Sequence, residues 1–240
     1  ALALVLNLEN FALLVQDSFY LDAYLRSVRV AGISALICLL VGYPMAYAIA
    51  RAPEPRRNLL LMLVVLPFWT SFLLRIMAWI GLLADNGVIN NLLLGLGIVA
   101  EPVRLLYTDA ALYLGIVYCY LPFMVLPLYA NLVKLDPALL EAASDLGARP
   151  WRAFLAVTLP LSLPGILAGT MLVFIPAVGE FVIPELLGGP DAQLIGRVLW
   201  TEFFTNRDWP MASALAVVLL LLLVLPIAWF QHLQGRGGGG

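Results

Sequence analysis

Charged residues are scarce in this chain of 240 residues, at 12% of the sequence. Soluble domains carry about a quarter charged residues, so an ordinary soluble protein is excluded. Cys38 and Cys119 lie in apolar runs and form no CxxC pair, and we interpret both as small apolar residues. His232 is the only histidine, so the sequence offers no spacing of metal ligands.

Catalytic machinery is missing too. A hydrolase needs a nucleophile beside a base, or a histidine and carboxylate cluster around a metal, and neither is present. No GxxxxGK[ST] phosphate loop occurs, and the only lysine, Lys134, follows no glycine. No basic, aromatic-interleaved patch indicates nucleic acid. We therefore expect no enzyme, and no cofactor bound by this chain.

Long apolar runs are what the sequence does contain: 63% of the residues are hydrophobic, and the mean hydropathy is +0.98. A spanning helix needs ~20 mostly apolar residues. We predict an all-α polytopic membrane protein embedded in a lipid bilayer, with five complete spans at residues 28–50, 58–84, 110–133, 165–183 and 211–230. Prolines inside these spans favour a packed bundle around a pathway over a simple anchor.

The distribution of Lys and Arg predicts the orientation. If the turn after the first span lies inside, the inner loops and tail hold seven basic and four acidic residues. The rest of the chain then holds six basic and eleven acidic residues. The positive-inside rule therefore places the loop at 134–164 and the carboxyl terminus in the cytoplasm.

That loop reads as a helical hairpin. Asp136 can cap a helix that starts at Pro137, and Gly147 can adopt the left-handed conformation that ends it. Pro150 can start a second helix, which stops before Pro160. The small residues beside Glu141 leave a surface on which a partner groove can lie. A plain amphipathic loop resting on lipid headgroups explains the same pattern equally well.

The spacing in this hairpin resembles the EAA signature of permeases from type I ABC importers, with Val157 where the family prefers isoleucine. The resemblance implies that the hairpin couples the permease to two separate ATPase subunits, which bind ATP and Mg. The residues that carry it are Glu141, Ala142, Ala143, Gly147, Leu159 and Pro160.

Four other stretches resemble polyamine permeases: residues 41–50, 66–83, 86–93 and 171–214. The similarity runs from about residue 7 to 231 and is closest to the putrescine-type subunit. It implies a heterodimer with a second homologous permease subunit, a periplasmic polyamine-binding protein, and a bacterial inner membrane location. The domains expected are a periplasmic segment at 1–27, with the family's first membrane helix absent, a permease domain at 28–231 and a flexible tail at 232–240.

Glu180 is the leading candidate for contact with cargo, because an ionisable group inside a span is a functional-site candidate. It lies about 22 Å along its span from Gly165, at ~1.5 Å per residue, which predicts an outer position. Aromatic rings can add cation–π attraction for an ammonium group. The candidate path residues are Trp69, Phe174, Glu180, Phe181 and Glu185.

Each candidate also has a structural interpretation. Glu180 can reach the outer headgroups, Arg75 can snorkel, and Trp69 can be a core residue. The alternative function is a proton-coupled secondary transporter of organic cations, in which Glu180 carries the proton. The function we predict is the permease subunit of an ATP-driven importer of putrescine- or spermidine-like polyamines.

Overall fold

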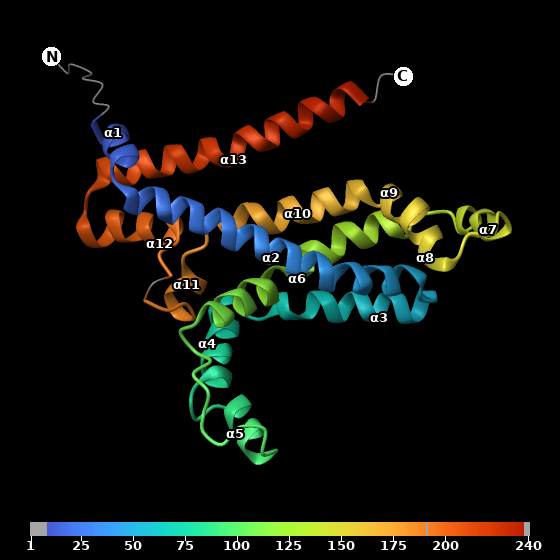
Figure 1. The fold of residues 1–240 in the computed structure, drawn as a ribbon, viewed down its shortest axis with the longest axis horizontal. Helices are drawn as coiled ribbons and strands as arrows, with labels where there is room; N and C mark the ends of the chain where they lie inside the picture. The colour runs from blue at the N-terminus through green and yellow to red at the C-terminus, as the bar shows by residue number, and fades with distance from the viewer. Residues whose placement is uncertain (1–8, 191, 238–240) are drawn as a thin grey trace.

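Three helices form the centre of the molecule. The computed structural model describes residues 9–190 and 192–237, and all regular elements within these ranges are helical. Helices α2 (Ser18–Arg51), α6 (Asp109–Leu132) and α10 (Leu163–Val178) run side by side along the long axis (Figure 1). The predicted span at 110–133 is therefore confirmed as a helix, and the all-α fold class is confirmed.

Glycines allow these helices to pack closely. A Cβ at Gly169 of α10 would lie 2.8 Å from the Met124 sulfur, and a Cβ at Gly165 would lie 2.8 Å from the Asn131 Cβ. Helix packing in membranes relies on such small residues, because lipid tails are as apolar as the side chains. The core between the three helices includes Cys38, Val125 and Val173, all fully buried.

Helix α2 begins at Ser18, earlier than the start predicted at residue 28. Asp17 caps it by accepting a hydrogen bond from the Phe19 amide at 2.9 Å. Ala23, Tyr24 and Ser27 are buried in the added turns. The prediction started too late because the charged residues Asp22 and Arg26 lower the hydropathy of this segment, although one face of the helix is buried.

The predicted span at 58–84 is wrong as a single helix. It is divided into α3 (Glu54–Val65), the 3₁₀ turn η1 (Leu66–Trp69) and α4 (Phe72–Leu83). Pro67 lies in the turn, and Thr70 and Ser71 have ψ values of 150° and 138°, outside the helical region. Hydropathy is continuous across this break, so the apolar run concealed it.

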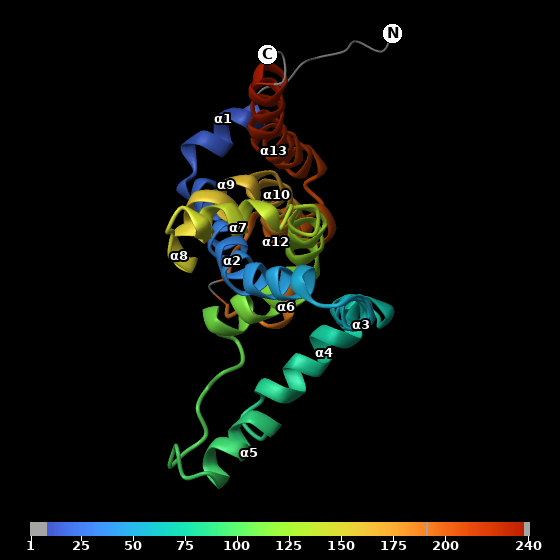
Figure 2. The same cartoon turned by 90° about the vertical axis from the view of Figure 1, so that its right-hand side faces the viewer.

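The stretch from α4 through α5 (Val88–Gly95) projects sideways from the bundle, and we call Phe72–Gly95 the lateral arm (Figures 1 and 2). The fully buried Asn90 fastens the loop that returns from it. The Asn90 side chain donates to the Val103 carbonyl and accepts from the Val103 amide, both at 2.9 Å.

At one end of the bundle stand α7 (Ala138–Asp145) and α8 (Pro150–Ala153), followed by the π-helical turn η2 (Phe154–Thr158) and α9 (Leu159–Leu161). The predicted stop before Pro160 is wrong, because helical backbone continues through Pro160 to Leu161. The chain then bends by 64° and enters α10. We call the bend around Ser162 the elbow.

The opposite end is built from short helices. Helix α10 stops at Val178, before the predicted end at 183, and α11 (Val182–Leu186), α12 (Ile195–Trp200) and the π-helical turn η3 (Thr201–Asn206) follow. Helix α1 (Glu9–Gln16) lies beside the start of α13 (Trp209–Gly237). Helix α13 extends beyond the predicted end of the fifth span at residue 230, and its C-terminal half diverges from the bundle in Figure 1.

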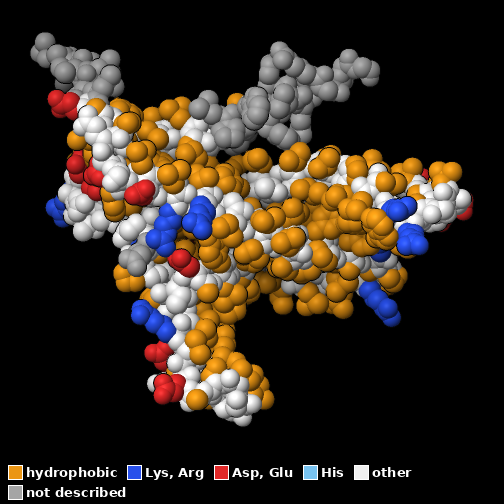
Figure 3. All heavy atoms as spheres, in the orientation of Figure 1, with side chains coloured by type: hydrophobic (Ala, Val, Ile, Leu, Met, Phe, Trp, Pro, Cys, Tyr) orange, Lys and Arg blue, Asp and Glu red, His pale blue; other side chains and the backbone are white. Residues whose placement is uncertain are grey.

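Three described stretches are long and apolar enough to cross a membrane: Ser18–Arg51, the lateral arm and Asp109–Leu132. The bent pair Pro150–Leu161 and Leu163–Val178 can make a fourth. The number differs from the five predicted spans, in part because the predicted runs at 58–84 and 165–183 are each interrupted by a break in the helix. Side chains at 225–227 and 229–237, part of the fifth, lie outside the described residues. Figure 3 shows an apolar flank between the two ends of the molecule; Lys and Arg are visible toward both ends, whereas most visible acids lie away from the α7–α8 end.

Candidate functional site

The hairpin at 134–164 folds as its local signals predict. Asp136 accepts a hydrogen bond from the Ala138 amide at 2.9 Å, which caps α7. Gly147 has a φ of +80°. The Ala148 amide donates to Ala143 and the Gly147 amide to Ser144, at 3.0 and 2.9 Å, which is the paired closure of a Schellman motif.

The hairpin tip presents a surface with little covering from its own chain. Helix α7 has no buried residue, Glu141 and Ala142 are exposed, and Ala143 is half-buried. Sequence reasoning missed two apolar side chains at the tip: Leu146 is 89% exposed and Trp151 is 55% exposed. Exposed apolar side chains that gather on one projection are typical of an interaction surface.

Leu159 and Pro160 do not lie at that tip. They belong to α9, at the elbow, where Leu159 is half-buried against the core and Pro160 is exposed. The six residues of the EAA pattern are therefore divided between an exposed tip and the joint that connects it to α10.

A hydrogen-bonded link ties this elbow to α2. The hydroxyl oxygens of Tyr43 and Ser162 lie 2.9 Å apart, and Ser162 donates to the Leu159 carbonyl at 2.9 Å. The Tyr43 ring also meets Phe154 edge-on, with ring centroids 5.6 Å apart. Because π-helical turns frequently occur at functional sites, the η2 turn beside this contact marks the elbow as a candidate joint.

Glu180 lies at the break after α10 and is only 8% exposed. Its Oε1 accepts hydrogen bonds from the amides of Phe181, Val182 and Ile183, at 3.1, 3.0 and 3.4 Å. Its Oε2 accepts a hydrogen bond from the Tyr120 hydroxyl. The carboxylate therefore covers the amino end of α11 and connects it to α6.

The contact with Tyr120 locates the carboxylate along α6. Tyr120 lies near the middle of the 24-residue α6, about 17 Å along the helix from Asp109 at ~1.5 Å per residue. The carboxylate therefore lies beside the middle of α6.

Among the other predicted path residues, Phe181 contacts Glu180 through its backbone amide, whereas Trp69 and Glu185 lie elsewhere. Trp69 is 76% exposed at the η1 turn, and Phe174 is half-buried between the two parts of the core. Phe181 stacks on Trp200 at 4.5 Å, and Glu185 pairs with Arg197 at 2.6 Å. Among the contacts of the described residues, none joins the side chain of Trp69 or Glu185 to that of Glu180.

Sequence reasoning missed the aromatic row that does reach Glu180. Tyr120 contacts Phe123 at 6.1 Å between centroids, and Phe123 contacts Phe68 at 5.1 Å. Phe68 precedes Trp69, so the η1 break turns one aromatic residue inward and leaves its neighbour exposed. No spacing in the sequence pairs α6 with η1, because the two lie about fifty residues apart.

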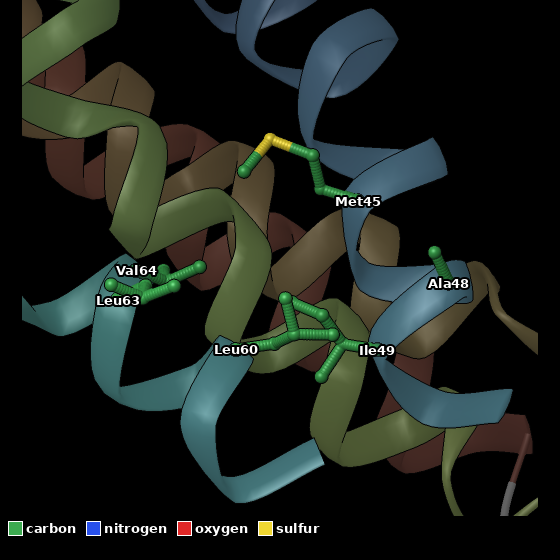
Figure 4. Close-up of a pocket in the computed structure, with 6 residues that line it drawn as sticks. All are labelled: Met45, Ala48, Ile49, Leu60, Leu63 and Val64. Atoms are coloured by element: carbon green, nitrogen blue, oxygen red, sulfur yellow. The ribbon is translucent and has the colours of Figure 1, made fainter. Parts of the chain in front are cut away.

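Neither a metal site nor a second cargo site is evident in the described part of the chain. No group of three or more His, Cys, Asp or Glu side chains that could hold a metal occurs in the described part of the chain. A groove of about 310 Å³ lies between α2 and α3 (Figure 4). It is lined by apolar side chains alone, Met45, Ala48, Ile49, Leu60, Leu63 and Val64, and so offers a cation no counter-charge.

Comparison with known proteins identifies the family. Residues 38–237 match the model of the binding-protein-dependent transport system inner membrane component. The chain belongs to this family. The match includes the hairpin, the elbow and Glu180, so the predicted type I ABC importer permease fold is confirmed and the chain is a multi-pass membrane protein.

Curated relatives agree with this assignment. The spermidine/putrescine transport system permease protein PotB of Salmonella typhimurium (strain LT2) is 43% identical over 228 residues, 94% of this chain and 79% of the relative. PotB of Escherichia coli (strain K12) is 42% identical over 228 residues, 94% of this chain and 82% of the relative. The inner membrane ABC transporter permease protein YdcU of the same strain is 33% identical, covering 95% of this chain and 76% of the relative.

Solved structures support the fold. A bacterial ABC transporter involved in the import of the acidic polysaccharide alginate matches with a TM-score of 0.76 and 19% identity, covering 98% of this chain and 85% of that chain. A second structure, of the bacterial alginate ABC transporter in complex with a periplasmic protein bound to alginate pentasaccharide, gives the same TM-score. The relatives are transport permeases and not enzymes, and none supports the alternative of a secondary transporter.

Proposed function

We propose that this permease is the membrane-spanning subunit of an ATP-driven polyamine importer. The observation that carries the proposal is the identity of 42–44% to spermidine/putrescine permeases over 94% of the chain. The exposed hairpin adds a surface through which a separate ATPase can act, since the sequence has no phosphate-binding loop of its own.

The working assembly would contain two ATPase subunits, a second homologous permease subunit and a periplasmic binding protein. ATP and Mg would bind to the ATPases. In this arrangement α7 docks at the ATPase in the cytoplasm, with Glu141 facing a basic residue, and Leu146 and Trp151 supply apolar contact. The elbow then passes movement of the hairpin to α10, whose far end leads to Glu180.

Glu180 would attract the cation in transit. Its carboxylate is held by three amides and one hydroxyl, so its position is set before cargo arrives. A polyamine passing the break between α10 and α11 would meet a negative charge in apolar surroundings, where Coulomb attraction is stronger than in water. Trp69 and Glu185 lie apart from it, so they would contact the cation at other stages of the path.

ATP hydrolysis by the assembled complex tests this proposal. The binding protein loaded with putrescine or spermidine should stimulate hydrolysis, and the empty binding protein should stimulate it less. Assembly that hydrolyses ATP without any response to either polyamine would contradict the cargo assignment. Failure of the chain to associate with any ATPase subunit would contradict the permease role of the hairpin.

A further inference from the structure

Arg75 is a cation within the lateral arm, and no described carboxylate pairs with it within 4 Å. Its Nε and Nη1 atoms are buried and have no hydrogen-bond partner there. The guanidinium lies over the rings of Phe68 and Phe72, at 5.4 and 5.7 Å from their centroids. The rings attract the positive charge, but they do not provide an oxygen atom that accepts hydrogen bonds from the guanidinium N–H groups.

Such an arrangement is incomplete for an arginine in apolar surroundings. Buried charged groups are normally paired, because burial removes the water that would otherwise bind them. An intramembrane ionisable residue usually faces a protein interior and has a partner. An anionic group from outside this chain would complete the site.

Depth argues against a lipid phosphate as that group. Arg75 lines a groove of about 460 Å³ with Trp79 of α4 and Tyr118 of α6, whose rings lie 5.4 Å apart. Tyr118 is nine residues into α6, about 14 Å along it from Asp109. Phosphates lie outside the hydrocarbon core, which is about 30 Å thick.

The surroundings of the groove favour a protein partner. The lateral arm leaves the bundle (Figure 2), and only 17% of its most apolar window is buried in this chain, against 50% for α6. Leu74, which lines the groove, is 67% exposed, and Trp69 and Met77 of the same chain segment are also exposed. A polyamine is excluded as the occupant, because Arg75 would repel it.

We propose that this groove receives a transmembrane helix of the second permease subunit, and that a carboxylate of that helix pairs with Arg75. The inference rests on the heterodimer of the proposed function. A guanidinium presents a planar fork of donors that suits a carboxylate, which makes the pair directional as well as attractive. Arg75 would therefore help select the partner subunit and leave cargo binding to other residues.

Photo-crosslinking tests the contact in the native Arg75 background. A benzoylphenylalanine placed at Leu74 in the full chain, co-expressed with the second permease subunit and the ATPases, should crosslink to the second permease. The same probe at Leu40, an exposed residue of α2, serves as the reference for nonspecific capture. Crosslinks to lipid alone at position 74 would overturn the proposal.

Substitution tests the charge. Arg75→Met should lower the amount of second permease that co-purifies by about tenfold, and Arg75→Lys should lower it less, because the ammonium keeps the charge but loses the fork. Arg29→Met, at an exposed arginine of α2, is the control. Wild-type recovery with Arg75→Met would overturn the inference even if polyamine uptake is normal. If recovery falls as expected but the wild-type complex imports no polyamine, the proposed cargo is refuted while the Arg75 contact stands.

Discussion

At Glu180 one carboxylate serves two purposes, because it caps the amino end of α11 and places a negative charge beside the middle of α6. The structural role needs only an acceptor oxygen. The proposed transport role needs the charge. The two roles can therefore be separated by a substitution that keeps the oxygen.

We predict that Glu180→Gln lowers polyamine uptake by about tenfold or more, since a hydrogen bond to a charged group contributes roughly 1.5–3 kcal/mol. The glutamine oxygen can still accept from the Val182 amide, so assembly should persist. Uptake in proteoliposomes, at matched protein levels, measures the effect. Glu101→Gln, at an exposed carboxylate outside the proposed path, is the control and should change uptake little. If Glu180→Gln takes up polyamine at the wild-type rate, the transport role is contradicted and Glu180 serves only to cap α11.

At the scale of elements, the hairpin and the elbow carry the coupling. Gly147 has open space around a Cβ position, so only its φ of +80° opposes a side chain. Gly147→Val should cost about 1–2 kcal/mol locally and reduce cargo-stimulated ATP hydrolysis severalfold while the protein still inserts. Gly32 of α2 also has open space around a Cβ position but no positive φ, so Gly32→Val is the control, and the complex that contains it should hydrolyse ATP normally. Equal hydrolysis in both variants would mean that the turn does not position the docking surface.

The elbow gives a second prediction. Tyr43→Phe removes the hydroxyl next to Ser162 and leaves the ring against Phe154, which should cost about 1 kcal/mol of stability. If the link transmits movement, more ATP should be hydrolysed per polyamine imported. Tyr47→Phe is the control, because the Tyr47 ring also contacts Phe154, with centroids 6.3 Å apart, and its hydroxyl makes no hydrogen bond among the described residues. An unchanged ratio in Tyr43→Phe would make the bond purely structural.

Local signals made the hairpin predictable, whereas breaks inside apolar runs were not. Asp136, Gly147 and Pro150 act on their own neighbours, so their roles could be inferred from the residues alone. The turn at Pro67 and the elbow at Ser162 depend on what packs beside them, and hydropathy runs through both unchanged. Glu180 was found because a charge stands out in an apolar run. Its partner Tyr120 comes from another helix and left no signal in the spacing.

At the scale of the whole molecule, the segments predicted to lie inside, which include α7 and α8, hold seven basic and four acidic residues, so we expect that end to be cytoplasmic. Single cysteines at the exposed positions Arg149 and Glu101, in a background without Cys38 and Cys119, test this. A membrane-impermeant thiol reagent added to intact cells should label position 101 and leave position 149 unlabelled until the cells are opened. Labelling of position 149 in intact cells would reverse the topology.

A single uptake measurement tests both the energy source and the cargo of the transporter. The complete complex, reconstituted in proteoliposomes with ATP on the hairpin side and the binding protein on the other, should accumulate labelled putrescine or spermidine against a gradient. Accumulation should require hydrolysable ATP and should persist when a protonophore removes the proton gradient. Uptake that ignores ATP but collapses with the proton gradient, or transport of neither polyamine, would contradict the assignment as an ATP-driven polyamine permease.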